Sequence, residues 1–186
     1  MSDEEPCSTA VSRRLALLAG VGLVSGCAAA RPPVVPGEKP AVLAADETYV
    51  CLSVTLLQAA GYAGLRFYFA GSPQEPLPAT AIGPATLQFT VNPPTKTGAW
   101  SGALLYKVKW GWFRLGGVDV MTKNAVFKMA TKLAPNAVNY VGDFVVDSGL
   151  YDIKVSVRTS QQTIEQARAK FGEVLARYPL AQRILT

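Results

Sequence analysis

Aromatic and basic residues interleave at positions 107–114, where the chain reads Lys-Val-Lys-Trp-Gly-Trp-Phe-Arg. Aromatic rings offer broad contact surfaces, and basic side chains pair with phosphate or carboxylate groups. This combination is typical of surfaces that bind glycans, lipid headgroups or cell-wall polymers. Consecutive strand residues point to opposite faces, so one of Trp112 and Phe113 should be exposed unless a bulge or covering layer intervenes. The candidate binding surface therefore comprises Lys109, Trp112, Phe113 and Arg114.

Asp143, Asp147 and Asp152 form a second group, because three carboxylates close together in a chain could bind calcium. A structural role is favoured over a metal site. In the hairpin predicted below, Asp143 lies opposite Lys154, and Asp147 is a turn residue of the usual kind. We therefore expect no metal ligands here.

Nucleophilic catalysis has little support in the sequence. The chain contains no histidine, which excludes Ser-His-Asp and Cys-His mechanisms and removes the commonest ligand of zinc and copper. Ser148 or Ser156 near Lys154 could form a Ser-Lys dyad, but no oxyanion-binding nest is in view. We expect no enzyme, no catalytic residue and no cofactor.

The N-terminus carries a different kind of chemistry, centred on Cys27. Arg13 and Arg14 precede an apolar run over residues 15–24, and Ser25-Gly26 places two small residues just before the cysteine. This arrangement is that of a cleavable export signal. The stretch Leu23-Val24-Ser25-Gly26-Cys27 resembles the lipobox of bacterial lipoproteins, and that resemblance implies cleavage before Cys27 and lipidation of its thiol.

This stretch has three alternative interpretations. A membrane-spanning helix is disfavoured, because only 16 residues from Leu15 to Ala30 are free of charge and a span takes about 20. A buried core helix is disfavoured by the proline-rich segment that follows. A signal for simple secretion stays open. Ser12-Arg13-Arg14-Leu15 also resembles the twin-arginine export motif, which leaves the export route open.

Cleavage would leave Cys51 without a cysteine to pair with, because Cys7 is removed and Cys27 is lipidated. The alternating sequence around Cys51 predicts a buried structural thiol. If Cys27 were not lipidated, it could form a disulfide with Cys51 in an oxidising compartment.

The chain divides into a signal peptide at 1–26, a lipidated proline-rich tether at 27–47 and one folded domain at 48–186. Removing residues 1–26 raises the formal net charge from +5 to +6. This modest basic excess favours anionic surroundings such as lipid headgroups. The basic residues are dispersed without a run of five, so we expect no nucleic-acid partner.

The dominant period in the domain is two residues, which predicts half-buried strands at 49–56, 65–69, 87–91 and 104–110. Residues 71–78 contain three prolines and are expected to form a loop. In the strand at 104–110, Tyr106, Val108 and Trp110 should face the core.

Two hairpins are predicted from matched apolar faces. A turn at Lys123-Asn124 would join 118–121 to 126–129, with Val120 opposite Phe127. A two-residue turn at Ser148-Gly149 would join 138–146 to 151–157 and place Val146 opposite Tyr151. In that pairing Val138, Tyr140, Phe144 and Val146 share the inward face, and Gly142 lies opposite Val155 at a bulge or close approach.

After Arg158 the period becomes 3.6, which predicts an amphipathic helix over 160–178 with Thr159 and Gln162 as a capping box. Pro179 ends this helix. Phe171 lies in its apolar stripe and should dock on the sheet. A short second helix over 180–185 is a weaker expectation.

The predicted order is about eight strands followed by one helix, which favours a mainly β fold, an antiparallel β-sandwich with a C-terminal amphipathic α-helix. Residues 133–144 read Leu-Ala-Pro-Asn-Ala-Val-Asn-Tyr-Val-Gly-Asp-Phe. This resembles the Leu-x-Pro-Gly-x-Tyr strand of small bacterial lipoproteins with a prealbumin- or carboxypeptidase-regulatory-like sandwich, with Asn136 in place of glycine. The resemblance implies this fold and a location in the cell envelope. It implies no catalytic residue.

The sequence thus predicts a noncatalytic envelope lipoprotein that assembles with or binds other envelope components through a membrane-tethered module. Its expected partners are the membrane, through the lipid anchor, and an envelope protein or cell-wall component. The alternative is a ligand-binding lipoprotein for lipid, glycan or peptide. Ala28, rather than aspartate, follows the cysteine, and by resemblance to enterobacterial sorting this favours the outer membrane facing the periplasm.

Overall fold

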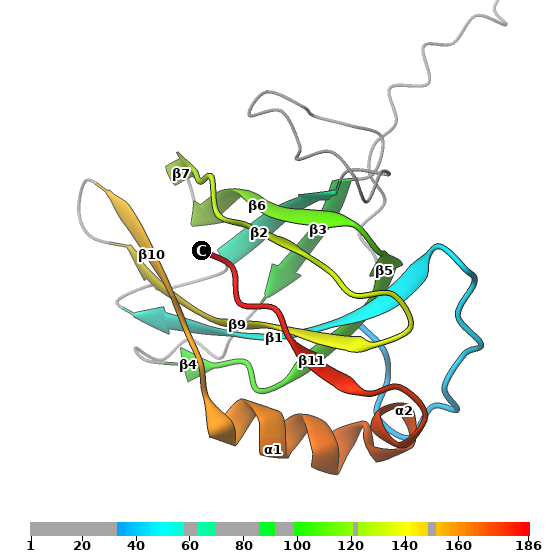
Figure 1. Ribbon diagram of the computed structural model, residues 1–186. Helices are drawn as coiled ribbons and strands as arrows, with labels where there is room; N and C mark the ends of the chain where they lie inside the picture. Colours follow the sequence, from blue (N-terminus) through cyan, green and yellow to red (C-terminus); the bar gives the residue numbers. More distant parts are fainter. Residues whose placement is uncertain (1–32, 58–62, 70–85, 92–98, 121–122, 149–151) are drawn as a thin grey trace, which may run out of the picture.

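The computed structural model describes residues 33–57, 63–69, 86–91, 99–120, 123–148 and 152–186. The described part of the chain is mainly β, with two sheets and two short helices (Figure 1). Sheet A contains β1 (Glu47–Leu57), β4 (Ala99–Trp100), β5 (Leu104–Lys109), β9 (Val138–Ser148), β10 (Ile153–Arg158) and β11 (Leu180–Gln182). Sheet B contains β2 (Ala63–Phe69), β3 (Thr86–Val91), β6 (Trp112–Val120), β7 (Lys123–Val126) and β8 (Ala130–Lys132).

Sheet A is the middle layer, because it is covered on both faces. Its first face packs on sheet B around Val54, Phe113 and Phe144. The second face packs on the helices through Tyr49, Leu105 and other residues. Figure 1 shows α1 and α2 lying along this second face. Since β1 is buried on both faces, even its polar Thr48 and Ser53 are inaccessible to solvent.

The central pair of sheet A is parallel, which corrects the expectation of a purely antiparallel fold. β1 pairs with β9 in parallel from Tyr49↔Val138 to Leu57↔Asp147. β11 also pairs with β9 in parallel. Parallel neighbours require a long connection. Here the chain from β2 to β8, which includes all of sheet B together with β4 and β5, lies between β1 and β9. Sheet B itself is antiparallel throughout its described pairs.

A bulge in β9 divides the residues that were expected to share one inward face. The register with β1 shifts between Cys51 and Leu52, so that Val141 is left over before Gly142. One extra residue in a strand places every side chain after it on the opposite face of the sheet. Val138 and Tyr140 therefore face the helices, whereas Phe144 faces sheet B.

Gly142 lies at this bulge with φ of 114°, a backbone conformation that favours glycine. A Cβ atom here would come within 2.4 Å of a methyl carbon of Val157. The predicted bulge is confirmed, but Val157 lies against Gly142 in place of the expected Val155.

Both predicted hairpin registers are wrong. In the β9–β10 pair, Val155 lies opposite Val146 and Lys154 opposite Asp147, so the connection is longer than the expected two-residue turn. Asp143 lies opposite Arg158. The expected partner of Val146, Tyr151, lies outside the described residues.

In the β6–β7 pair, Val120 lies opposite Lys123 and Asp119 opposite Asn124. Lys123 and Asn124 are therefore strand residues, and the connection falls at 121–122. The amide of Asn124 donates a hydrogen bond to the Asp119 carboxylate, which stabilises this register over the predicted one.

The C-terminal helix is shorter than predicted and is broken. α1 (Gln161–Lys170) has Phe171 as its C-cap residue, and α2 (Gly172–Arg177) follows in a different direction. Glycine at 172 is a poor helix former, which favours the break at this point. The N-cap is Ser160, whose Oγ accepts a hydrogen bond from the Thr163 amide at 3.3 Å, in place of the predicted Thr159. Tyr178 adopts an extended conformation before Pro179, as residues before proline commonly do.

The segment predicted as a second helix, 180–185, instead forms β11 and an extended tail. Leu185 is buried in the core between the two sheets, and its amide donates to the Val141 carbonyl at 3.2 Å. The Ala130 amide donates to the Thr186 carbonyl at 3.1 Å. The C-terminal tail thus links sheet A to sheet B.

Candidate functional site

The four residues predicted to form a binding surface do not share one surface. Lys109 belongs to sheet A, where its ammonium lies 2.6 Å from the Asp46 carboxylate. Trp112, Phe113 and Arg114 belong to β6 of sheet B. Phe113 is fully buried in the core, and Arg114 is also buried. Trp112 is half-buried, so it is the more exposed of the two neighbouring aromatic residues.

Trp112 lies on the face of sheet B that points away from sheet A, since its neighbour Phe113 points into the core. Its partner across β8 is Lys132, which is exposed. The indole Nε1 of Trp112 is buried and has no hydrogen-bond partner within the described part of the chain. This N–H and the ammonium of Lys132 could both donate hydrogen bonds to an oxygen of a ligand.

The three aspartates are separated by the fold. Asp143 is buried beneath α1, and Asp152 forms a 3.6 Å ion pair with Lys154 at the surface. Asp147 lies on β9 opposite Lys154. Among the described residues, no group of three or more histidine, cysteine or acidic side chains could hold a metal ion.

Asp143 is the centre of a hydrogen-bonded network that joins sheet A to α1. The Tyr140 hydroxyl donates to Asp143 Oδ1 at 2.8 Å, and the Thr163 hydroxyl donates to Oδ2 at 2.9 Å. The Ser160 amide donates to the Tyr140 hydroxyl at 2.9 Å, and Ser53 Oγ lies 3.3 Å from Thr163 Oγ1. We call Ser53, Tyr140, Asp143, Ser160 and Thr163 the helix-anchor network.

Hydroxyls beside a carboxylate can serve as an activated nucleophile, but burial determines the role here. Thr163 and Ser53 are inaccessible to solvent, and Asp143 is 7% exposed. Burial, followed by the contact with Asp143, raises the pKa of the Tyr140 hydroxyl. The Tyr140 hydroxyl therefore keeps its proton, and the network fastens the start of α1 to the sheet. Sequence analysis missed it because Thr163 and Ser53 are ordinary polar residues in their own segments.

Cys51 is a buried free thiol on β1, as the alternating sequence predicted. Burial, with a smaller effect from the Asp143 charge, raises the pKa of this thiol to about 12. The thiolate is the reactive form, so Cys51 is inert in the folded protein.

The N-terminal segment over residues 33–46 packs against the domain, whereas the sequence predicted a free tether up to residue 47. We call this segment the strap. The Val34 amide donates to the Leu105 carbonyl of β5 at 2.7 Å. Leu43 is buried beside Tyr178, whose hydroxyl accepts from the Leu43 amide at 3.2 Å and donates to the Ala41 carbonyl at 3.1 Å. The strap is thus part of the fold.

Prolines concealed this packing in the sequence, because a proline-rich composition is typical of extended spacers. The available signal was the two apolar dipeptides Val34-Val35 and Val42-Leu43. One residue of each, Val34 and Leu43, contributes to the core on the helix side of sheet A.

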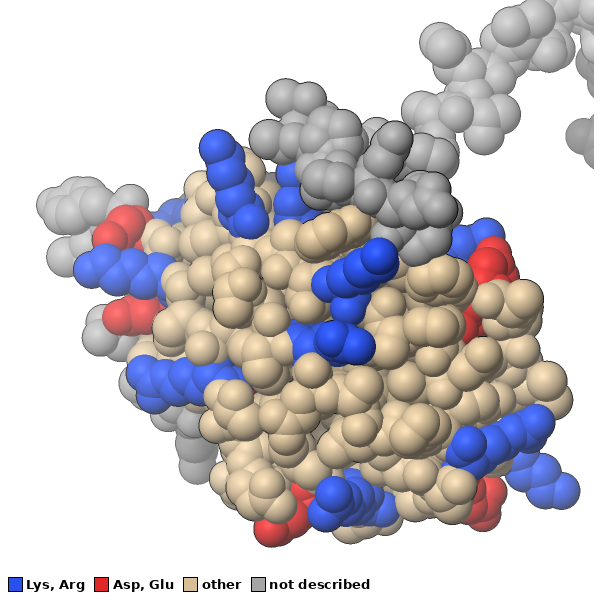
Figure 2. Space-filling view, viewed as in Figure 1, with Lys and Arg blue, Asp and Glu red and all other residues tan. Residues whose placement is uncertain are grey.

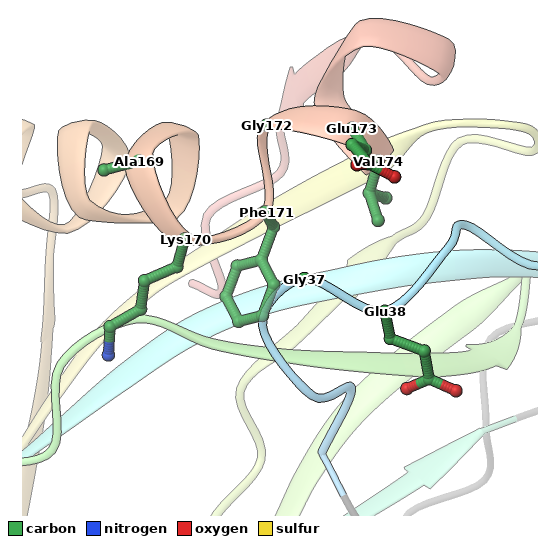
Figure 3. A pocket seen from close by; sticks show the side chains of 8 residues that line it. All are labelled: Gly37, Glu38, Ala169, Lys170, Phe171, Gly172, Glu173 and Val174. Atoms are coloured by element: carbon green, nitrogen blue, oxygen red, sulfur yellow. The ribbon is translucent and has the colours of Figure 1, made fainter.

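A small cavity of about 260 Å³ lies between the strap and the junction of the two helices. Figure 3 shows the Phe171 ring pointing toward Gly37, with the Lys170 and Glu38 side chains directed to opposite sides. Phe171 and Val174 supply apolar walls. With one cation and two acidic side chains, Glu38 and Glu173, the lining favours no single ligand charge.

Basic and acidic side chains are scattered over the face seen in Figure 2, without a large patch of one sign. Within the described residues, no helix is long and apolar enough to cross a membrane. No protein-family model, curated protein or solved structure matches the chain.

Proposed function

We propose that the protein is a noncatalytic lipoprotein of the bacterial envelope, lipidated on Cys27 and located at the outer membrane facing the periplasm. Its folded module assembles with or binds other envelope components. The observation that carries the proposal is the short length of chain between the lipobox-like sequence and the folded domain. Val34, seven residues after Cys27, is bonded to β5, so a lipid on that cysteine would hold the whole module at the membrane.

Three further observations support this proposal. The two sheets share one core, which favours a β-sandwich. Asn136 has a φ of 48°, the left-handed region that favours glycine, at the place where the resembled lipoprotein pattern has glycine. The polar groups of the helix-anchor network bond to one another in the interior, as structural groups do.

Replacing Cys27 with alanine should abolish lipidation and release the protein from the membrane fraction, because a lipid is then no longer attached. Cells fed an alkyne fatty acid would show labelled wild-type protein in the outer-membrane fraction and unlabelled Cys27→Ala protein outside it. Cys7→Ala is the matched control, since Cys7 lies within the segment that is removed. Equal labelling and fractionation of Cys27→Ala and wild type would contradict the proposal.

A second candidate function, ligand binding, is favoured by the buried Trp112 N–H near exposed Lys132. A glycan, peptide or lipid headgroup with an acidic oxygen would satisfy that donor. We expect such a ligand to change the fluorescence of the wild type more than that of Trp112→Phe, and to raise the melting temperature of the wild type. A screen of acidic oligosaccharides by both readouts tests this, with Trp110→Phe as the control, because the Trp110 Nε1 already donates to the Ala45 carbonyl at 2.9 Å. Identical responses of the wild type and Trp112→Phe would remove this candidate.

A further inference from the structure

Two of the three large apolar side chains exposed in the described part of the chain lie on the strap. Val35 is 62% exposed and Val42 is 74% exposed, whereas the third, Val126 on β7, is 73% exposed. Single exposed valines are common, but two of them within one short segment that is otherwise packed on the domain make this segment the most apolar exposed stretch among the described residues.

The length of chain before the strap limits how far this surface can be from a lipidated Cys27. The seven residues from Cys27 to Val34 span at most about 25 Å when fully extended. A free tether from Cys27 to Glu47 would instead reach about 70 Å. Because Val34 is bonded to β5, the strap side of the domain must stay close to the membrane that holds Cys27.

Charge at the strap is compatible with an anionic membrane surface. Its acidic end is neutralised, since Asp46 pairs with Lys109 at 2.6 Å and the next residue, Glu47, pairs with Lys107 at 3.1 Å. In the middle of the strap, the exposed Lys39 directly follows the exposed Glu38, so their opposite charges offset each other. A segment without net charge that exposes apolar side chains can enter the headgroup region of an anionic bilayer without electrostatic repulsion.

We propose that the strap is a membrane-contacting surface, with Val35 and Val42 seated among the headgroups of the same bilayer that holds the lipid on Cys27. The inference rests on the proposed function and specifies its geometry: the strap and the adjacent helix junction face the membrane. Sheet B then faces away from the bilayer and is accessible to envelope partners. A lipid on Cys27 keeps the effective concentration of the strap at the surface high, so two valines suffice to select this orientation.

The test uses the full lipidated protein, purified from membranes and reconstituted into phosphatidylethanolamine–phosphatidylglycerol vesicles that contain a headgroup nitroxide lipid. A bimane label is placed on Val42→Cys or, as a matched control, on Val126→Cys, which is equally exposed. β7 and the strap lie on opposite sides of the molecule in Figure 1. The added cysteine is the reactive thiol, because Cys27 is blocked by lipid and Cys51 is buried with a pKa of about 12.

We expect the nitroxide lipid to quench bimane at position 42 several-fold more than at position 126. Equal quenching at the two positions, or none at position 42, would overturn the orientation. The mass of the purified chain shows whether Cys27 carries a lipid, so it distinguishes a failure of the orientation from a failure of the proposed function. A chain without lipid on Cys27 would overturn both, whereas a lipidated chain with equal quenching would overturn the orientation alone.

Discussion

Replacing Phe171 with alanine is expected to lower the free energy of unfolding by about 3–5 kcal/mol, the usual range for truncating a buried phenylalanine. Phe171 is 5% exposed and belongs to the core between sheet A and the helices. It also lies at the junction of α1 and α2, so its loss should loosen both helices. Chemical denaturation of the folded domain would measure the change.

The control for this substitution should be Arg168→Ala, because Arg168 is exposed in the last turn of α1. Gln166, which lies off the apolar stripe, is unsuitable, since its Oε1 accepts a hydrogen bond from the Ala103 amide. Arg168→Ala should change stability by less than about 0.5 kcal/mol. If Phe171→Ala unfolded at the same denaturant concentration as the wild type, the helices would contribute little to the fold.

Replacing Asp143 with alanine should destabilise the protein by about 3 kcal/mol, because charged hydrogen bonds each contribute roughly 1.5–3 kcal/mol and their buried partners would lose an acceptor. Those partners are the hydroxyls of Tyr140 and Thr163. Thr163→Val removes one of the two bonds and should have a smaller effect. The measurement is again equilibrium unfolding, with hydrogen exchange in α1 as a local readout.

Asp152→Ala is the matched control for Asp143, since Asp152 is exposed and its ion pair with Lys154 is at the surface. Exposed ion pairs contribute about 0–1 kcal/mol. Two results would show that the helix-anchor network does not hold the helix to the sheet. One is an equal loss of stability in Asp143→Ala and Asp152→Ala, and the other is hydrogen exchange in α1 that is no faster in either variant than in the wild type.

The apolar alternation was sufficient to predict that β1, β2, β3, β5, β9 and β10 exist, and it assigned the faces of Tyr106 and Val108 correctly. It could not predict which strands pair. The parallel neighbours β1 and β9 meet only because the intervening chain crosses to sheet B and returns. Long-range pairing of this kind leaves no mark on the local period.

The wrong hairpin registers have a common physical cause. Val146 was expected opposite Tyr151 and lies opposite Val155, a shift of four residues. An even shift keeps every side chain on its original face, so the apolar pattern fits both registers equally well. Only the length of the turn distinguishes them, and Ser148-Gly149 suggested a turn shorter than the observed connection.

The candidate site was predictable in part. The expectation that one of Trp112 and Phe113 would be exposed, unless a bulge or covering layer intervened, followed from the period of two. Phe113 lies in the core and Trp112 is half-buried. The distance between Lys109 and Trp112 in the fold was not predictable, because the chain changes sheets between them. The packing of the strap was concealed by its prolines, although Leu43 is only 9% exposed.

The central claim is that Cys27 carries the lipid that holds this module at the membrane, and the mass of the N-terminal peptide of the membrane-purified protein tests it most directly. We predict a chain that begins at Cys27, lacks residues 1–26 and carries a diacylglyceryl group on its sulfur. A chain that retains residues 1–26, or one that begins at an unmodified residue, would contradict the claim.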